Sequence, residues 1–328
     1  MRQLKHLFFS LLIASAYLFP RPVPANQELE NSDTTQLMWA AYAGDIYTMR
    51  QLIEQKHDVN QISKYGTTAL YYAAGATRTQ ATPKGSTATV KFLLQHGAKP
   101  NVKRDNKGNG YTALMAACDN LNLASAALLL EYGADVNART TGGDSALNIA
   151  ADRLEPKLVK LLLEHGAHVN GNADSNGQTP LISAIAASPS LNFRSFEEAQ
   201  EKLQQNTPQL AKAIEIVNLL LSHKAEVNIL DRDGKSALTH AITKVNLLLV
   251  RPLLEHGADP NVTDKSMGNA TPIILAASFG SVGIADVLIK KGANVNTKDG
   301  FGKSALDYAL ASESQRMVEM LRKAGAKK

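Results

Sequence analysis

Small and apolar residues recur along this chain in a pattern whose period is near 33 residues. Each unit opens with a Thr or Ser, which precedes a small residue or Pro, an apolar residue and a pair of small residues. Each unit closes with a Leu-rich run that ends in Gly-Ala-x-Val-Asn or a close variant, and the clearest copy runs from Ser145 to Asn170. The opening residues are Thr35, Thr68, Thr112, Ser145, Thr179, Ser236, Thr271 and Ser304. The repetition predicts a series of similar structural units after residue 33.

The spacing within a unit predicts a short helix, a second helix and an extended finger. In the fourth unit, Leu158, Leu161 and Leu162 recur at the spacing of an amphipathic helix, and we expect all three to be buried. Gly166 supplies the left-handed residue that ends this helix without a Cβ penalty. The hydroxyl of Ser145 is expected to cap the first helix or to fix the turn before it.

One unit of this size cannot bury its apolar face, so the units must stack on their neighbours. The period near 33 and the Thr-Pro-Leu type of opening resemble the ankyrin repeat. The resemblance implies an all-α solenoid of about eight helix-turn-helix units with short finger turns. It places one domain over residues 34–328, after a short linker at residues 26–33.

Two units are longer than the others, and both insertions fall between the two helices of the unit. Residues 75–89 are predicted to be a polar loop, which an array tolerates at little thermodynamic cost. Residues 188–211 carry apolar residues that pack either on the array or on a partner. Thr207-Pro208 is typical of a helix start, and we expect a lengthened second helix that ends near Ser222.

Residues 1–25 have the pattern of a secretory signal peptide. Arg2 and Lys5 precede an apolar run over residues 7–19, and Val23-Pro24-Ala25 is a small-residue cleavage pattern. The run is shorter than the ~20 residues of a typical membrane-spanning helix. An uncleaved anchor is the alternative, and the prolines that follow the run disfavour it.

Cleavage lowers the formal net charge from +5 to +2, which is not the charge of a typical nucleic-acid-binding protein. A signal peptide, repeats and a single cysteine together predict a bacterial periplasmic protein, with secretion as the second choice. We expect no stable membrane insertion after cleavage, no nucleic-acid partner and a monomer.

The sequence offers little catalytic or metal-binding chemistry. His96, His165, His223 and His256 all stand one residue before the closing Gly or its Lys substitute. One histidine per unit predicts helix ends instead of a zinc site, whose ligands converge on one ion. Cys118 is expected to be buried and inert. Nucleophile-elbow, His-Glu-x-x-His and phosphate-loop motifs are all missing from the sequence. We therefore predict that the protein is not an enzyme and holds no cofactor or metal.

The resemblance to ankyrin arrays implies that the protein binds another protein through its concave side. In such arrays this side consists of finger tips and of the first-helix residues that follow the small pair. The corresponding first-helix positions here hold Tyr42, Asp119, Asn120, Asp152, Arg153, Lys244 and Phe279. The corresponding finger tips hold Tyr65, Arg104, Tyr111, Arg232, Met267 and Phe301. Aromatic residues and Arg are the types that most often anchor interfaces, although exposed aromatics are also common on ordinary surfaces.

The identity of the partner stays open at this stage. One interpretation is an accessory that supports an envelope enzyme, and another is an immunity protein or inhibitor that neutralises a toxin delivered to the periplasm. A third is a secreted effector that binds host proteins. An enzyme is the fourth alternative, and the motifs favour it least.

Overall fold

The computed structural model describes residues 35–64, 66–75, 86–104, 109–171, 177–190 and 208–327. These residues form 16 α-helices. The helices follow each other in pairs, so the prediction of an all-α solenoid of about eight helix-turn-helix units is confirmed. The predicted signal peptide at residues 1–25 and the linker at residues 26–33 lie outside the described residues, and so does Tyr65.

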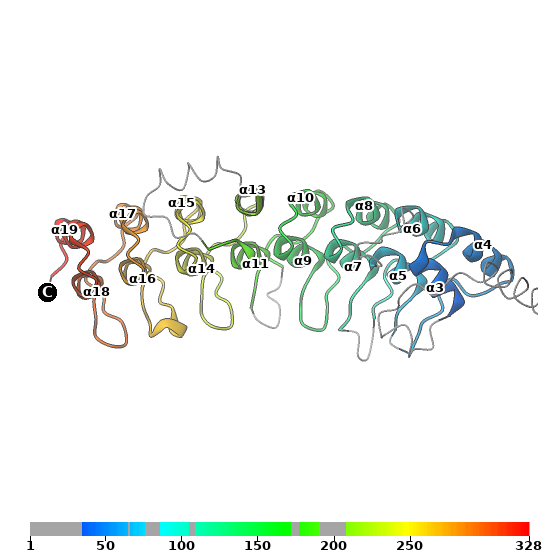
Figure 1. Ribbon diagram of the computed structural model, residues 1–328, viewed down its shortest axis with the longest axis horizontal. Helices are drawn as coiled ribbons and strands as arrows, with labels where there is room; N and C mark the ends of the chain where they lie inside the picture. Colours follow the sequence, from blue (N-terminus) through cyan, green and yellow to red (C-terminus); the bar gives the residue numbers. More distant parts are fainter. Residues whose placement is uncertain are drawn as a thin grey trace, which may run out of the picture.

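The helices lie in two rows along the long axis of the molecule (Figure 1). The first helices of the units form one row: α3 (Gln36–Ala43), α5 (Ala69–Gly75), α7 (Ala113–Asp119), α9 (Ala146–Asp152), α11 (Pro180–Ala187), α14 (Ala237–Thr243), α16 (Pro272–Ser278) and α18 (Ala305–Ala311). The second helices form the other row: α4 (Ile46–Glu54), α6 (Ser86–Gln95), α8 (Leu123–Glu131), α10 (Pro156–Glu164), α13 (Pro208–Ser222), α15 (Leu247–Glu255), α17 (Val282–Lys290) and α19 (Gln315–Lys323).

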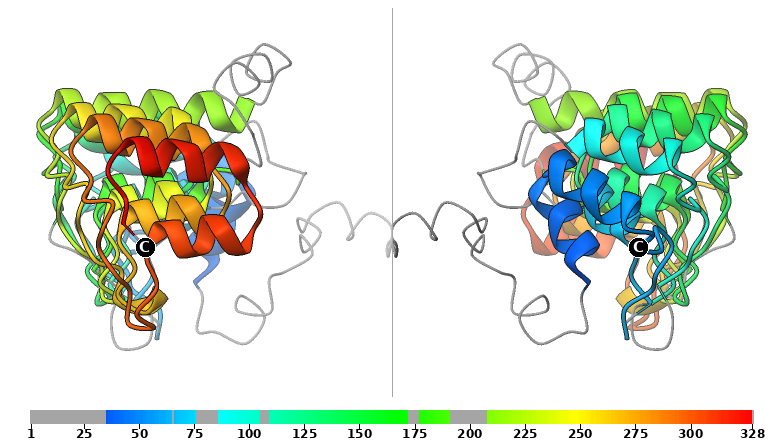
Figure 2. Two further views of the ribbon diagram at one scale, coloured as in Figure 1. Left: turned by 90° about the vertical axis from the view of Figure 1, so that its left-hand side faces the viewer. Right: turned by 90° about the vertical axis from the view of Figure 1, so that its right-hand side faces the viewer.

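The fingers connect each second helix to the first helix of the next unit. They leave from one end of the helix rows and project beyond the first helices (Figure 2). Isolated antiparallel bridges close the bases of several fingers, as between Leu230 and Ser236 or between Lys298 and Ser304. The finger before α16 also contains a short 3₁₀-helix, η1 (Lys265–Met267). We call the side bounded by the first helices and the fingers the concave face.

Hydroxyl groups begin the first helices as the sequence predicts. The opening Ser or Thr accepts a hydrogen bond, at 3.2–3.3 Å, from the backbone amide three residues later in every unit except that of Thr271. The Asn148 side chain in turn accepts a hydrogen bond from the Ser145 backbone amide, which completes a capping box. Each such cap stabilises its helix by about 1 kcal/mol.

The core runs without interruption through the array because each helix buries one face against the next unit. In α10, Leu158 and Leu162 are fully buried, as predicted. Leu161 is only half-buried at the edge of the same core, so the prediction of its full burial is wrong. The reason is angular: Val159 and Leu163 complete the buried face, which turns Leu161 toward the rim of the interface.

The two longer units confirm one expectation and correct another. Helix α13 begins at Pro208 and ends at Ser222, and its 15 residues make it the lengthened helix that the sequence predicts. Residues 86–89 are helical, so the prediction of a loop over residues 75–89 is wrong at that end. Thr89 and Val90 are fully buried in α6, and their burial holds this start of the helix. Gly75 likewise belongs to α5.

Asparagine side chains bridge consecutive units at the closing Val-Asn or Pro-Asn. The amide Nδ2 donates to the carbonyl oxygen of the closing Gly in the next unit, at 2.9–3.3 Å, and Oδ1 accepts from the backbone amide two residues after that Gly, at 2.7–2.9 Å. These bridges start from Asn60, Asn101, Asn137, Asn228, Asn261 and Asn296. Local spacing in the sequence does not predict this reach into the next unit, which is a finding of the structure.

The junction after Asn170 keeps the bridge in a different form. Lys224 stands where six of the eight units have Gly, as Lys56 does in the first unit, and it adopts the same left-handed backbone, with φ of 65°. Asn170 Oδ1 still accepts from the backbone amide of Glu226 at 2.8 Å. Its Nδ2 donates to the Glu226 carboxylate at 2.8 Å instead of to a backbone carbonyl. A charged acceptor thus replaces the glycine carbonyl at this junction.

We predict that Leu162→Ala lowers the free energy of unfolding by about 2–5 kcal/mol, because it removes a fully buried side chain. Leu161→Ala is the matched control, and it should lose about half as much or less because part of the side chain already faces water. Chemical denaturation of both variants measures the difference. Equal losses would show that the burial of α10 described above is wrong.

We also predict that Asn137→Ala lowers the free energy of unfolding by about 1–2 kcal/mol, because two hydrogen bonds between units are lost at a solvent-exposed site. Asn218, which lies exposed on α13, provides the control. Asn218→Ala should leave the stability unchanged or raise it slightly, since Ala favours the helix. A change below about half a kcal/mol for Asn137→Ala would mean that water replaces the bridge without loss.

Candidate functional site

A small cavity lies on the concave face where three units meet. Its volume is about 170 Å³. Its walls come from the finger bases and first helices of units three, four and five: Tyr111, Asp119, Asp144, Asn148, Ile149, Asp152, Arg153, Gln178 and Ser183. We call it the three-unit pocket. Drug-sized ligands occupy roughly 300–1,000 Å³, so this pocket fits a single side chain and not a larger molecule.

An ion pair crosses the pocket from one unit to the next. The Nε and Nη2 groups of Arg153, the residue that ends α9, both donate to Asp119 Oδ1 at the end of α7, at 2.8 Å and 2.5 Å. This hydrogen bond raises the pKa of the Arg153 guanidinium, although burial opposes it. Both side chains stay partly exposed, at 33% and 25%. The pair therefore contributes little to stability and mainly fixes the positions of the two groups.

Tyr111 forms a wall of the pocket next to the acidic residues. Burial, followed by the nearby charges of Asp119 and Asp144, raises the pKa of Tyr111 to about 12. The phenol therefore stays protonated at neutral pH. No described residue forms a hydrogen bond with its hydroxyl group, which remains available as a donor and an acceptor.

Buried polar groups line the inner part of the pocket. Asn148, only 2% exposed, donates to the carbonyl of Gln178 at 2.9 Å and so ties unit four to unit five. Ile149, 8% exposed, gives the pocket an apolar surface. Ser183 of α11 is 5% exposed, yet its hydroxyl has no hydrogen-bond partner within the described ranges.

The structure brings four of the predicted binding residues together here: Tyr111, Asp119, Asp152 and Arg153. The other lining residues were missed by sequence reasoning. Asp144 and Gln178 each stand one residue before a unit opening, where the predicted finger meets the first helix. This regular position in the unit could have identified Asp144 and Gln178 from the sequence. Ser183 has no such signal in the sequence, because a serine inside an apolar helix is typical of a packed position.

Three other predicted residues are engaged within the array. The Arg104 guanidinium lies 5.7 Å from the centre of the Tyr71 ring, a cation–π geometry. Tyr42 packs edge-to-face against Trp39, and the Asn120 side chain donates to a carbonyl of its own α7 helix. Lys244 is half-buried at the end of α14.

The remaining predicted residues lie exposed toward the C-terminal end of the concave face. Phe301 is 75% exposed, and Met267 and Phe279 are each 41% exposed. Phe301 lies against Gly268 of the neighbouring finger, and the Gly300 amide donates to the Gly268 carbonyl. Arg232 is exposed on the finger before α14. This end of the face is apolar and basic, whereas the three-unit pocket is acidic.

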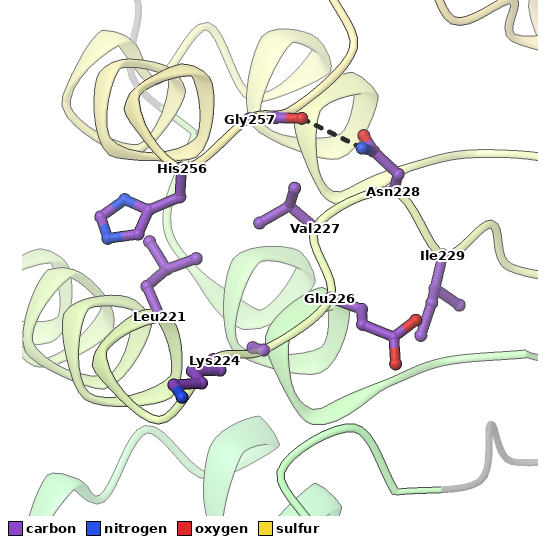
Figure 3. Close-up of a pocket in the computed structure, with 9 residues that line it drawn as sticks. Leu221, Lys224, Glu226, Val227, Asn228, Ile229, His256 and Gly257 are labelled. Carbon is purple, nitrogen blue, oxygen red and sulfur yellow. Dashed lines mark hydrogen bonds between the residues drawn. The ribbon is translucent and has the colours of Figure 1, made fainter.

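A larger hollow of about 590 Å³ lies between the ends of α13 and α15 (Figure 3). Leu221, Val227 and Ile229 line it together with Lys224 and Glu226. The bond from Asn228 to the Gly257 carbonyl, at 3.0 Å, crosses its edge. The hollow is part of the bridged junction between units, and its lining has no concentration of one charge.

The repeated histidines lie at the ends of second helices, as predicted. Nδ1 of His96, His165, His223 and His256 lies 2.7–2.8 Å from the carbonyl oxygen four residues earlier. Cys118 is fully buried, and burial raises the pKa of its thiol to about 12. Among the described residues, no three or more His, Cys, Asp and Glu side chains are grouped as metal ligands would be. In the same part of the chain, each helix is too short or too polar to cross a membrane.

We predict an alkaline titration step that belongs to Tyr111. Because its pKa of about 12 in the folded protein exceeds the ordinary value of 10.0, Tyr111 contributes stability that is present below pH ~10 and lost as the pH rises to about 12. Tyr111→Phe should remove this loss and one phenolate step near pH 12 from an ultraviolet titration. An ultraviolet titration in which Tyr111→Phe leaves the step near pH 12 in place would contradict the burial of Tyr111.

Comparisons with known proteins agree with this architecture. The family profile described as ankyrin repeats, in three copies, matches residues 9–103, 37–140, 199–264 and 246–328, which is more than half of the chain. The chain is 31% identical over 155 residues to the Arabidopsis thaliana potassium channel AKT2/3. The matched stretch is 47% of this chain and 16% of that protein.

Two further relatives match shorter stretches. The Drosophila melanogaster transient receptor potential channel pyrexia is 36% identical over 109 residues, or 33% of this chain and 11% of that protein. The human neurogenic locus notch homolog protein 1 is 34% identical over 109 residues, or 33% of this chain and 4% of that protein. The chain thus spans 16% or less of these relatives, and what it shares with them is repeats. With paired helices, bridged units and a matching profile, the chain belongs to the ankyrin-repeat family.

Proposed function

We propose that this protein is a non-catalytic scaffold that binds another protein through its concave face. Ankyrin repeats typically mediate protein–protein interactions. The observation that carries the proposal is the exposure of large apolar side chains where unit stacking does not need them. Phe279, Phe301 and Met267 all lie on first-helix ends or fingers. Aromatic groups with this exposure are typical anchors of an interface.

The C-terminal end of the concave face and the three-unit pocket near its middle differ in charge, which gives a partner a direction in which to bind. Lys265, Lys298 and Lys303 lie exposed on the fingers near Phe301 and Met267. The aspartates at the bases of these fingers are buried and hold the finger turns, as Asp299 does by accepting from two backbone amides. Complementary charge mainly improves the rate and the specificity of association.

The location and the biological role are also proposals. The signal pattern at residues 1–25 supports export to a bacterial periplasm, where the protein would serve an envelope enzyme or act as an immunity protein or inhibitor. Secretion as an effector is the alternative. Cell fractionation with N-terminal sequencing tests the location: recovery of a chain that begins near Asn26 in the periplasm supports export, and a cytosolic chain that retains Met1 contradicts it.

Partner binding is tested by affinity capture from periplasmic extract, followed by measurement of Kd with the purified partner. Phe279→Ala and Phe301→Ala should each weaken binding by about fivefold or more, or roughly 1 kcal/mol. Tyr47→Ala is the matched control, because Tyr47 is 71% exposed on α4 in the second-helix row. Circular dichroism should remain unchanged for all three variants.

The competing site is the insertion at residues 188–211, most of which lies outside the described residues. If deletion of residues 191–207 abolishes binding while Phe279→Ala and Phe301→Ala have no effect, the assignment to the concave face is wrong.

A further inference from the structure

We propose that the three-unit pocket accepts a cationic side chain, Arg or Lys, of the protein partner. This inference rests on the proposed function and adds to it the chemistry of one contact. Three carboxylates line the pocket, from Asp119, Asp144 and Asp152, against one guanidinium from Arg153. Asp119 is paired with Arg153, and Asp144 accepts from the Thr140 hydroxyl at 3.3 Å, so the exposed carboxylate of Asp152 is the one that a cation reaches first.

The shape and size of the pocket suit a single extended side chain. Its volume of about 170 Å³ exceeds by severalfold the ~30 Å³ share of one water molecule in the liquid. Ile149 and the ring of Tyr111 provide surface for the methylene stem of Arg or Lys. The face of an aromatic ring also attracts a cation, by about 0.5–1 kcal/mol at exposed sites.

A second observation points to a ligand independently of the carboxylates. Ser183 is 5% exposed and lines the pocket, and its hydroxyl has no hydrogen-bond partner in the described part of the chain. The Ser183 oxygen is not an enclosed atom, so it faces the open space of the pocket, where a donor can reach it. A guanidinium or ammonium group in the pocket would donate to this oxygen and would also pair with Asp152, which is exposed at the pocket rim.

The Arg153–Asp119 pair leaves acceptor atoms open in the pocket and holds them in place. The guanidinium donates twice to the same oxygen, Oδ1 of Asp119, which leaves Oδ2 of that carboxylate as an acceptor. The pair also links the end of α9 to the end of α7, and this link helps to fix the separation of the two helices. The acceptors of the pocket are thus positioned before a ligand arrives, which lowers the entropic cost of binding.

The test titrates the ¹⁵N-labelled full chain with Nα-acetyl-arginine amide and Nα-acetyl-lysine amide at low salt, followed by NMR. Nα-acetyl-citrulline amide is the neutral probe of nearly equal shape. We expect saturable shifts at the amides of Tyr111, Ile149 and Ser183 with at least one cationic probe and not with the citrulline probe. Equal shifts with the citrulline probe, or shifts that lie elsewhere on the array, would overturn the proposal.

Two variants make the result specific to the pocket. Asp152→Asn should lower the affinity for the cationic probe by about two- to fivefold, as the loss of an exposed charge pair does. Ser183→Ala should lower this affinity further. Asp233→Asn, the same substitution on an exposed finger position, should have no effect. If Asp152→Asn and Ser183→Ala both leave the affinity unchanged, the pocket does not bind the cation.

The same variants separate this proposal from the proposed function. If the purified partner binds with full affinity to Asp152→Asn and Ser183→Ala but loses affinity with Phe279→Ala, the concave face binds and the cation pocket is wrong. If the cationic probes bind but the concave substitutions leave the partner's affinity unchanged, the pocket stands and the proposed interface fails.

Discussion

The closing asparagine of each of the first seven units joins that unit to the next through both ends of its side-chain amide. Asn137 illustrates the geometry: its Nδ2 donates to the Gly166 carbonyl at 3.1 Å, and its Oδ1 accepts from the His168 amide at 2.8 Å. Since Gly166 ends the second helix of the next unit, the bridge fixes where that helix stops relative to its neighbour. The three-unit pocket depends on this spacing because its walls come from α7, α9 and α11.

Apolar burial supplies most of the free energy of stacking, and the bridges supply its register. Leucine and alanine side chains form one continuous buried cluster along the array, but such contacts are non-directional. A hydrogen bond tolerates little change in distance or angle. The junction after Asn170 supports this division of roles, since the bridge persists there even though Lys224 has replaced glycine and the longest insertion precedes α13.

Much of the fold follows from the sequence because it repeats at a fixed period. The opening hydroxyls cap first helices, Cys118 is buried, and the repeated histidines meet helix-end carbonyls, all as local spacing predicts. Leu161 shows the limit: three leucines at helical spacing define a face, but only the packing of Val159 and Leu163 decides which leucine reaches the rim.

The candidate site was less accessible to prediction because it forms between units. Position within the unit identified Tyr111, Asp119 and Arg153 as candidates. They line one pocket only because stacking brings residues of neighbouring units, such as Asp119 and Arg153 at 34 positions apart, into contact. Arg104 also occupies a finger position, but its guanidinium lies over Tyr71. No local pattern distinguishes these two outcomes, since both arise from neighbours one unit away.

Hydrogen exchange tests the bridging asparagines most directly. The residues Asp135, His168 and Asp259 are exposed, yet their backbone amides donate to asparagine Oδ1 at 2.7–2.9 Å. We expect NMR to show these amides exchanging far more slowly than that of Arg232, an exposed finger residue whose amide donates to no described residue. In Asn137→Ala the His168 amide alone should lose its protection, while Asp135 and Asp259 keep theirs. If all these amides exchange as fast as Arg232 in the unmodified protein, the bridges do not hold the units in register.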